Sequence, residues 1–142
     1  IILIVSEDSF DRALRNAIRI GLDKIIAWTD ASVVQEVSNL QTMPEIHAKE
    51  LDARRDAVVL DVRKESEFSR GAIEGAMPIA HTRVLHHLEE LDSSKEWIVN
   101  CQGGSRSAAT CMALRRNGFD VTNLAGGYGG WKQFKDTCAV TQ

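Results

Sequence analysis

The stretch NCQGGSRSAATCMAL, Asn100 to Leu114, joins the end of a predicted strand to an apolar, helix-prone segment. Two glycines after Cys101 allow positive φ angles, so successive backbone N–H groups can face one point. The helix that follows adds its unpaired N-terminal N–H groups and the positive end of its dipole, and Arg106 adds a fixed charge. These features favour an anion at the centre of the loop and predict a reactive thiolate at Cys101. The alternative is that Cys101 is a small buried side chain at a strand end and that the glycines form a plain turn.

Strands and helices alternate along the rest of the chain. The predicted strands are 1–5, 24–28, 57–62, 97–101 and 121–125, and Pro78 limits 76–80 to a short extended piece outside the centre of a sheet. The predicted helices are 7–20, 32–37, 47–55, 64–68, 82–91 and 105–117, and the glycine-rich 126–134 leads into a short last helix. This alternation predicts an α/β fold with a parallel sheet, helices on both of its faces, and ligands bound at the carboxyl ends of the strands.

An internal repeat divides the chain. RIGLD at 19–23 resembles RNGFD at 116–120, and each follows a predicted strand and helix. In the first copy SEDSF, at 6–10, replaces the glycine-rich loop and contains no cysteine. We therefore expect residues 1–40 to form a partial, inactive β-α-β unit with a linker and residues 41–142 to form the main domain; chance similarity between such short motifs is the alternative. An open β-α-β unit leaves a sheet edge unpaired, which allows a homodimer.

The composition is that of an ordinary globular protein. The chain has 142 residues, 44% of them hydrophobic and 26% charged, which suits one domain with its own core. A net charge of −3 gives no reason to expect nucleic acid or an anionic membrane as a partner. The apolar run IILIV, at 1–5, is too short for a signal peptide or a membrane span. Because the first residue is not Met, we expect a fragment of a longer protein.

The three cysteines, at 101, 111 and 138, show no metal-ligand spacing and follow no secretory signal. We therefore expect reduced thiols and a cytoplasmic location. Cys111 lies within a predicted helix and is expected in the core. Cys138 is either an exposed thiol or the partner of a disulfide with Cys101. We assign no metal to the chain and expect its four histidines at the surface.

Three segments resemble the rhodanese family of sulfurtransferases: LDVRKESEFSRGAIEGAMPI at 60–79, VNCQGGSRSA at 99–108 and LRRNGFDVTNLAGGYGGW at 114–131. They occur in the family's order and contain a D-V-R strand end, an E-F-x-x-G turn, the C-x-x-G-x-R-S loop and an L-x-G-G-x-x-x-W ending. Several motifs in one order are more specific than the loop alone. The resemblance implies a rhodanese-like fold, in which helices flank both faces of a central, parallel, five-stranded sheet, with the N-terminal β-α-β unit as an addition.

The resemblance also implies sulfur transfer in two steps. The thiolate of Cys101 would take the outer sulfur of thiosulfate or of a low-molecular-weight persulfide, and the enzyme persulfide would then give it to a thiol or to cyanide. No cofactor is implied. Arg106 is expected to hold the loop and to assist the anionic leaving group. The other site residues have supporting roles: Gln102 tunes donor choice, Gly103, Gly104, Ser105 and Ser107 shape the loop and supply hydrogen bonds, and Asp61 and Arg63 form a structural pair nearby.

Loop length separates members of this family. Four residues lie between Cys101 and Arg106, as in the sulfurtransferases, whereas the related cell-cycle and arsenate-directed phosphatases have five. The tighter ring suits the terminal sulfur of a persulfide. The sequence departs from the family pattern at two places outside the cysteine loop. Ala72 stands where the family has a histidine, and PIA, at 78–80, replaces N-I-P. We expect altered hydrogen bonding and a different loop shape there.

A partial inactive copy before an active one resembles the C-terminal region of persulfide dioxygenase–rhodanese fusion proteins. In those proteins a metallo-β-lactamase-fold domain comes first, so we expect such a domain upstream in the full-length protein. The main alternative function is a non-catalytic rhodanese-like module, with a regulatory or scaffolding role in a multidomain protein of sulfide or persulfide metabolism. The third hypothesis is a small-anion phosphatase or arsenate reductase, and the length of the loop argues against it.

Overall fold

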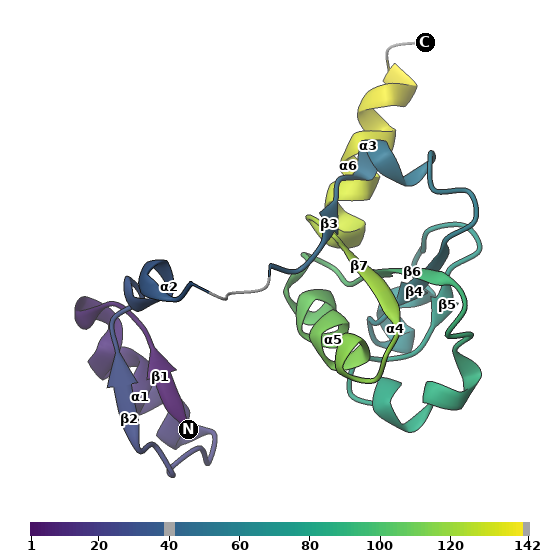
Figure 1. Ribbon diagram of the computed structural model, residues 1–142. Helices are drawn as coiled ribbons and strands as arrows, with labels where there is room; N and C mark the ends of the chain where they lie inside the picture. Colours follow the sequence, from purple (N-terminus) through teal and green to yellow (C-terminus); the bar gives the residue numbers. More distant parts are fainter. Residues whose placement is uncertain (39–41, 141–142) are drawn as a thin grey trace. The chain divides into compact units, whose positions relative to one another are not determined.

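The smaller part of the chain is a short β-α-β unit. The computed structural model describes residues 1–38 and 42–140, and the chain divides into two compact units, Ile1–Thr42 and Met43–Gln142 (Figure 1). The boundary predicted between residues 40 and 41 lies outside the described residues. The first unit contains β1 (Ile2–Ile4), the 3₁₀ turn η1 (Glu7–Ser9), α1 (Phe10–Arg19), β2 (Ala27–Thr29) and α2 (Val33–Glu36). β1 and β2 pair in parallel.

The second strand of this unit starts later than predicted. The apolar pattern places it at 24–28, but β2 begins at Ala27. The Ile25 N–H donates to the Asp23 carbonyl at 2.9 Å, which closes a tight turn where the strand was expected to start. Only after this turn is the chain extended enough to pair with β1.

The larger unit is a five-stranded parallel sheet with the order β3-β7-β6-β4-β5. The strands are β3 (Glu45–Ile46), β4 (Val58–Asp61), β5 (Met77–Pro78), β6 (Glu96–Asn100) and β7 (Asp120–Leu124). The helices are α3 (Ala48–Leu51), α4 (Glu65–Phe68), α5 (Ser105–Arg116) and α6 (Gly127–Val140), with 3₁₀ turns η2 (Val84–His86) and η3 (Leu88–Glu90). The predicted rhodanese-like sheet is confirmed, and Pro78 lies on its edge strand, where no ladder N–H is needed.

Alternate residues of β6 enter two separate cores. Trp97 and Val99 pack with Leu114 of α5 on one face of the sheet, and Cys111 of the same helix lies there with no exposed surface. Ile98 points to the other face, where its core includes side chains of α3 and α6. Helices therefore cover both faces, as predicted, because side chains in a strand alternate between the faces of the sheet.

Three elements of this unit differ from the prediction. The helix expected at 82–91 is two 3₁₀ turns, because His87, with φ −125° and ψ 22°, interrupts the helical backbone between them. The helix expected at 47–55 is the shorter α3, and β3 was missed because only two residues of it pair with β7. The last helix is longer than expected and begins at Gly127, so the predicted glycine-rich lead-in forms its first turn.

Gly127 lies at a contact that no other residue can make. Its φ is +57°, and a Cβ added to it would lie 2.2 Å from the carbonyl oxygen of Cys101. The absence of a side chain lets the start of α6 touch the loop that follows β6. Cys138, near the other end of the same helix, is exposed.

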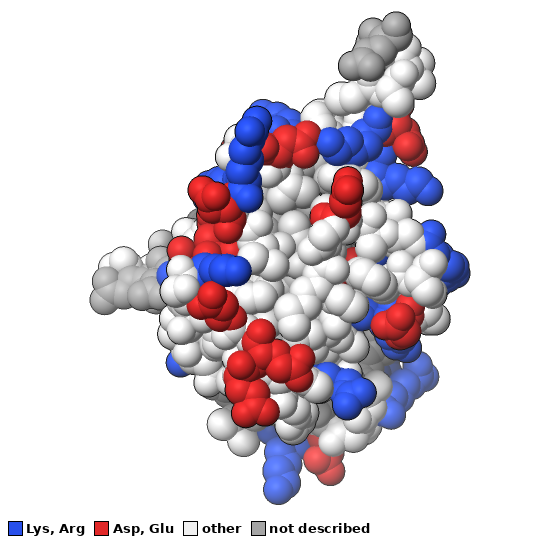
Figure 2. Space-filling model, turned by 90° about the vertical axis from the view of Figure 1, so that its right-hand side faces the viewer, with Lys and Arg blue, Asp and Glu red and all other residues white. Residues whose placement is uncertain are grey.

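The surface shows no dominant charge on the face drawn in Figure 2. Lys and Arg side chains occur across this face together with Asp and Glu side chains. Among the described residues, no helix combines the length and the apolar character needed to cross a bilayer. The same residues contain no cluster of three or more His, Cys, Asp or Glu side chains suited to a metal ion.

Replacing Gly127 by alanine should destabilise the larger unit severely. Gly75 is the matched control, because its φ is +73° and a Cβ there would meet nothing within 4 Å. Gly75→Ala should cost about 1–2 kcal/mol, the strain of a left-handed backbone. Gly127→Ala adds a steric clash with a buried carbonyl and should cost at least about 2 kcal/mol more. Urea unfolding of both variants measures the difference, and equal costs would contradict the proposed contact.

Candidate active site

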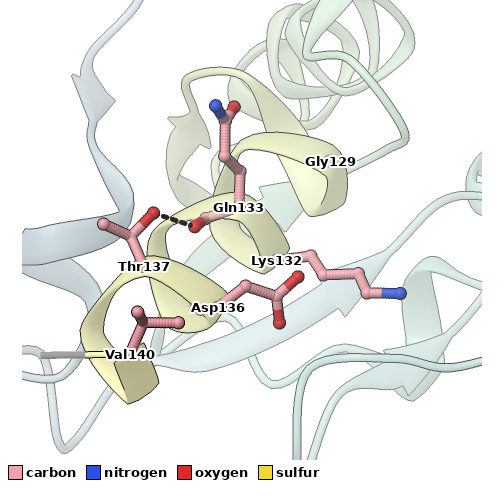
Figure 3. Close-up of a pocket in the computed structure, with 6 residues that line it drawn as sticks. All are labelled: Gly129, Lys132, Gln133, Asp136, Thr137 and Val140. Carbon is pink, nitrogen blue, oxygen red and sulfur yellow. Dashed lines mark hydrogen bonds between the residues drawn. The ribbon is translucent and has the colours of Figure 1, made fainter. Parts of the chain in front are cut away.

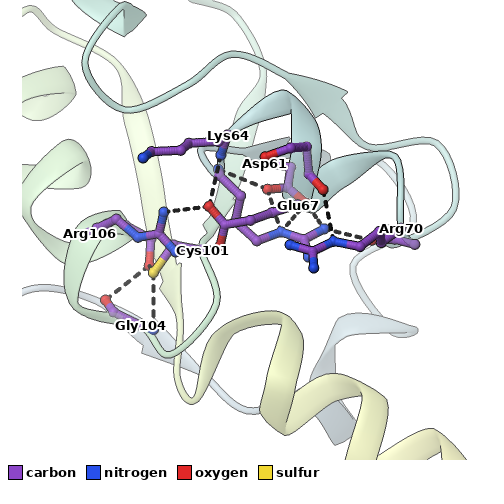
Figure 4. A network of polar contacts seen from close by, with 11 residues as sticks. Asp61, Lys64, Glu67, Arg70, Cys101, Gly104 and Arg106 are labelled. Carbon is purple, nitrogen blue, oxygen red and sulfur yellow. Dashed lines mark hydrogen bonds and ion pairs between the residues drawn. The ribbon is translucent and has the colours of Figure 1, made fainter.

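The sulfur of Cys101 lies inside the loop between β6 and α5 (Figure 4). The Gly104 N–H donates to this sulfur at 3.1 Å, and the Ser107 hydroxyl lies 3.4 Å from it. Gly104 has φ +100°, a left-handed conformation that turns its N–H inward just before the helix starts. Only 1% of Cys101 is exposed. The predicted arrangement of cysteine, glycines and helix start is thus present in the fold.

The first turn of α6 holds the other side of the loop. The Tyr128 N–H donates to the Cys101 carbonyl at 2.7 Å, and the Gly129 N–H donates to the Gln102 carbonyl at 3.0 Å. Both acceptors are loop carbonyls, so the N–H groups of a helix start are used to fix the loop. The carbonyls consequently face α6 and leave the opposite side of the loop to N–H groups.

The groups that donate hydrogen bonds to the Cys101 sulfur lower the pKa of its thiol. Burial is the largest single influence and acts to raise this pKa. The Ser107 hydroxyl and the backbone N–H groups of Ser107, Gly103 and Gly104 act in the opposite direction, and together they hold the pKa of the Cys101 thiol below its ordinary value. Cys111, which is also buried, has its pKa raised to about 12, mainly by burial. The two thiols of α5 and its loop therefore differ in reactivity.

Arg106 makes a two-point ion pair with Glu67. Its two terminal nitrogens lie 2.9 Å from the two carboxylate oxygens. These hydrogen bonds, with a further one from the Lys64 N–H, lower the pKa of Glu67 to about 2, and they raise the pKa of Arg106. The Cys101 thiolate also contributes to the raised pKa of Arg106. The guanidinium thus lies beside the sulfur and is already matched by a carboxylate (Figure 4).

Asp61 and Arg63 form a second, fully buried ion pair. The Arg63 Nη2 lies 2.7 Å from the Asp61 carboxylate and donates also to the Gly71 carbonyl at 2.8 Å. The Arg63 guanidinium stacks on the Tyr128 ring of α6, 4.0 Å from its centroid. Arg63 therefore links the end of β4, the turn containing Ala72 and the first turn of α6. The geometry fits the structural role expected for this pair.

The remaining predicted residues lie at the rim of the site. Gln102, Gly103 and Ser105 are exposed, and Ser105 is the first residue of α5. Two residues important for the geometry, Glu67 and Tyr128, were absent from the predicted site. Both fall inside motifs quoted from the sequence, but their partners lie far away along the chain. A glutamate three residues after a helix cap is an ordinary helix-start signal and does not reveal a second role.

Removing the Ser107 hydroxyl should raise the pKa of Cys101. Ser107→Ala deletes one donor to the sulfur, so the profile of iodoacetamide alkylation rate against pH should move to higher pH. At pH 7 alkylation should be slower by several-fold, and at high pH the two proteins should react alike. Ser105→Ala is the control, because no described hydrogen bond joins its hydroxyl to the sulfur. An unchanged profile in Ser107→Ala would contradict the hydrogen-bond explanation.

The Glu67–Arg106 pair should make stability depend on pH. The folded-state pKa of Glu67 is about 2, below its ordinary value of 4.5, so its contribution is complete above pH 4.5 and is lost as the pH falls towards 2. Glu67→Gln should lower the free energy of unfolding by about 1–2 kcal/mol at neutral pH, with allowance for solvent screening. Urea unfolding at several pH values should show this difference shrinking below pH 4. A difference independent of pH would rule out the ion pair as its source.

Comparisons with known proteins identify the family to which the larger unit is similar. The family model described as the rhodanese-like domain matches residues 43–134. The chain is 30% identical over 93 residues to a thiosulfate sulfurtransferase, GlpE, of Coxiella burnetii, which covers 65% of this chain and 87% of that protein. A crystal structure of a rhodanese-related protein from Thermoplasma volcanium superposes with a TM-score of 0.62 at 28% identity, over 63% of this chain and 91% of that one.

A larger protein also contains a similar fold. The structure of an NAD-dependent persulfide reductase from A. fulgidus has a TM-score of 0.54 and 34% identity, with 63% of this chain covered and only 16% of that chain. The similarity is thus to a small part of that enzyme. Because the family model matches residues 43–134, well over half of the chain, this protein belongs to the rhodanese-like family of sulfurtransferases.

Proposed function

We propose that the protein transfers sulfane sulfur through a persulfide on Cys101. The observation that carries the proposal is the sulfur of a low-pKa thiol held at 3.1 Å from the Gly104 N–H inside a four-residue loop. A thiolate is the nucleophilic form of cysteine, and the same N–H groups that favour the thiolate would favour a persulfide anion. The donor is thiosulfate or a low-molecular-weight persulfide.

The first step forms one S–S bond and breaks another. The Cys101 thiolate attacks the outer sulfur of thiosulfate, the bond to the inner sulfur breaks with its electron pair, and sulfite leaves as a dianion. The enzyme keeps the transferred sulfur as a persulfide anion, so charge and sulfur balance without an added oxidant. Arg106 lies beside the sulfur and would assist the departing anion.

The second step returns the enzyme to its starting state. A thiolate or cyanide attacks the terminal sulfur of the persulfide, and the Cys101 thiolate is the leaving group. Gln102, exposed at the rim, would meet donors and acceptors as they arrive. The low pKa of Cys101 makes it a better leaving group, which speeds this step.

The wider context remains a prediction from the sequence. It comprises the upstream metallo-β-lactamase-fold domain, the inactive repeat in residues 1–40, the cytoplasmic location and the homodimer. The β-α-β unit in Ile1–Thr42 supports the repeat. The non-catalytic module is the competing function, and the complete loop around Cys101 argues against it.

Thiosulfate should add one sulfur atom to the protein. After incubation and removal of excess donor, intact mass should show this adduct in the wild type and in the control Cys138→Ser, and cyanide should remove it. Cys101→Ser should gain nothing. Lack of an adduct with thiosulfate and with small persulfides would overturn the proposal and favour the non-catalytic module. Hydrolysis of an aryl phosphate by the wild type would favour the phosphatase instead.

A further inference from the structure

A groove runs from the active-site loop along α5. It has a volume of about 370 Å³, at the lower end of the range of small-molecule sites, which is roughly 300–1,000 Å³. Ser105 and Arg106 lie at its loop end, and Ala109 and Ala113 continue it along one side of the helix. Val84 and Leu85 of η2 form the facing wall.

The groove is apolar and contains no carboxylate among the described residues that line it. Leu85 is 54% exposed, so its aliphatic side chain is available to a ligand in the groove. Arg106 belongs both to this groove and to the surroundings of the Cys101 sulfur, so the groove and the reactive sulfur are joined through one side chain.

The charge balance around the sulfur selects the kind of ligand. Each of the two arginines near the loop is paired with a carboxylate: Arg106 with Glu67, and Arg63 with Asp61. The two pairs together carry no net charge, so each arginine attracts a small dianion less strongly than an unpaired arginine would. A ligand with one negative sulfur and an apolar body uses both the N–H groups and the groove.

The larger hollow drawn in Figure 3 does not offer such a site. Its volume is about 630 Å³, but all the side chains that line it belong to α6, and Lys132 and Asp136 bring opposite charges to it. A hollow bounded by one helix has no opposing wall to enclose a ligand. The groove beside α5 has walls from two separate elements.

We propose that the groove binds the organic part of a small aliphatic thiol, the species that leaves a donor persulfide or accepts the sulfur. This inference rests on the proposed function and specifies the substrate class of the same site. In the transfer from an alkyl persulfide, the Cys101 thiolate attacks the outer sulfur and the alkyl thiolate departs with the electron pair of the broken S–S bond. The acceptor step is the reverse reaction with a second thiol, so one groove serves both steps.

Acceptor thiols with alkyl chains of different length test whether the groove binds the alkyl part. The full chain is first given sulfur by thiosulfate, and the loss of persulfide is then followed by stopped flow with ethanethiol, butanethiol and hexanethiol at limiting concentrations. These thiols have similar intrinsic reactivity, so differences report binding. Burial of apolar surface should raise the second-order rate constant about twofold or more for each added CH₂. Cyanide, which has no alkyl chain, provides the reference rate.

Two exposed side chains give a matched pair of variants. Leu85 in the groove and Met112 outside it are both 54% exposed, so replacement by asparagine should affect folding alike. Leu85→Asn should lower the hexanethiol rate, relative to cyanide, by about threefold to tenfold, whereas Met112→Asn should leave the ratio unchanged. Ala109→Leu, which narrows the groove on the helix side, should remove the advantage of hexanethiol over butanethiol.

The outcomes separate this inference from the proposed function. A rate that is independent of the alkyl chain length would contradict the binding of the thiol in the groove, and so would equal effects of Leu85→Asn and Met112→Asn. Neither result would contradict persulfide formation on Cys101. If Cys101 accepts no sulfur from thiosulfate or a small persulfide, both proposals fail. A chain-length dependence that Leu85→Asn abolishes and Met112→Asn retains would support both.

Discussion

The hydrogen bonds from the start of α6 to the loop carbonyls determine the geometry of the active site. A planar trans peptide points its C=O and its N–H in opposite directions. When Tyr128 and Gly129 hold the carbonyls of Cys101 and Gln102, the N–H groups of those two peptide units must face the other way. This requires α6 to approach within a distance that only Gly127 permits, since any Cβ would meet the Cys101 carbonyl oxygen. One missing methyl group therefore fixes the orientation of these two peptide units, including the Gly103 N–H that helps to lower the pKa of Cys101.

The electrostatics of the site follow from the same arrangement. Burial alone would raise the pKa of Cys101, as it does for Cys111, yet the two pKa values move in opposite directions. The difference comes from oriented N–H and hydroxyl dipoles, because the nearby arginines are matched by carboxylates. Fixed dipoles need little reorganisation when the charge on the sulfur changes. The ion pairs instead hold the structural elements around the site together. Glu67 connects α4 to Arg106 after the loop, and Arg63 connects the end of β4 to Tyr128.

Local signals in the sequence predicted the parallel sheet and the loop that surrounds the Cys101 sulfur. Each of these signals spans only a few consecutive residues: the apolar strands 57–62 and 97–101, and the glycines after Cys101. The prediction failed where contacts between distant parts of the chain determine the local structure. β3, for example, is two residues long and forms only by pairing with β7. The glycines of 126–134 indicate a loop locally, but their contact with Cys101 makes them the first turn of a helix. Glu67 was missed for the same reason, because its partner Arg106 lies on another element.

The position of α6 in chain order has a consequence for biosynthesis. The cysteine loop leaves the ribosome before the helix whose N–H groups hold its carbonyls. Until residues 127–129 have been added, the carbonyls of Cys101 and Gln102 lack their α6 donors, and the buried face around Ile98 lacks Tyr128 and Trp131. The nascent loop would therefore be less firmly held, and the lowered pKa of Cys101 would be complete only when α6 docks. The full acidity of this thiol therefore depends on a segment of the chain that is synthesised after the cysteine loop itself.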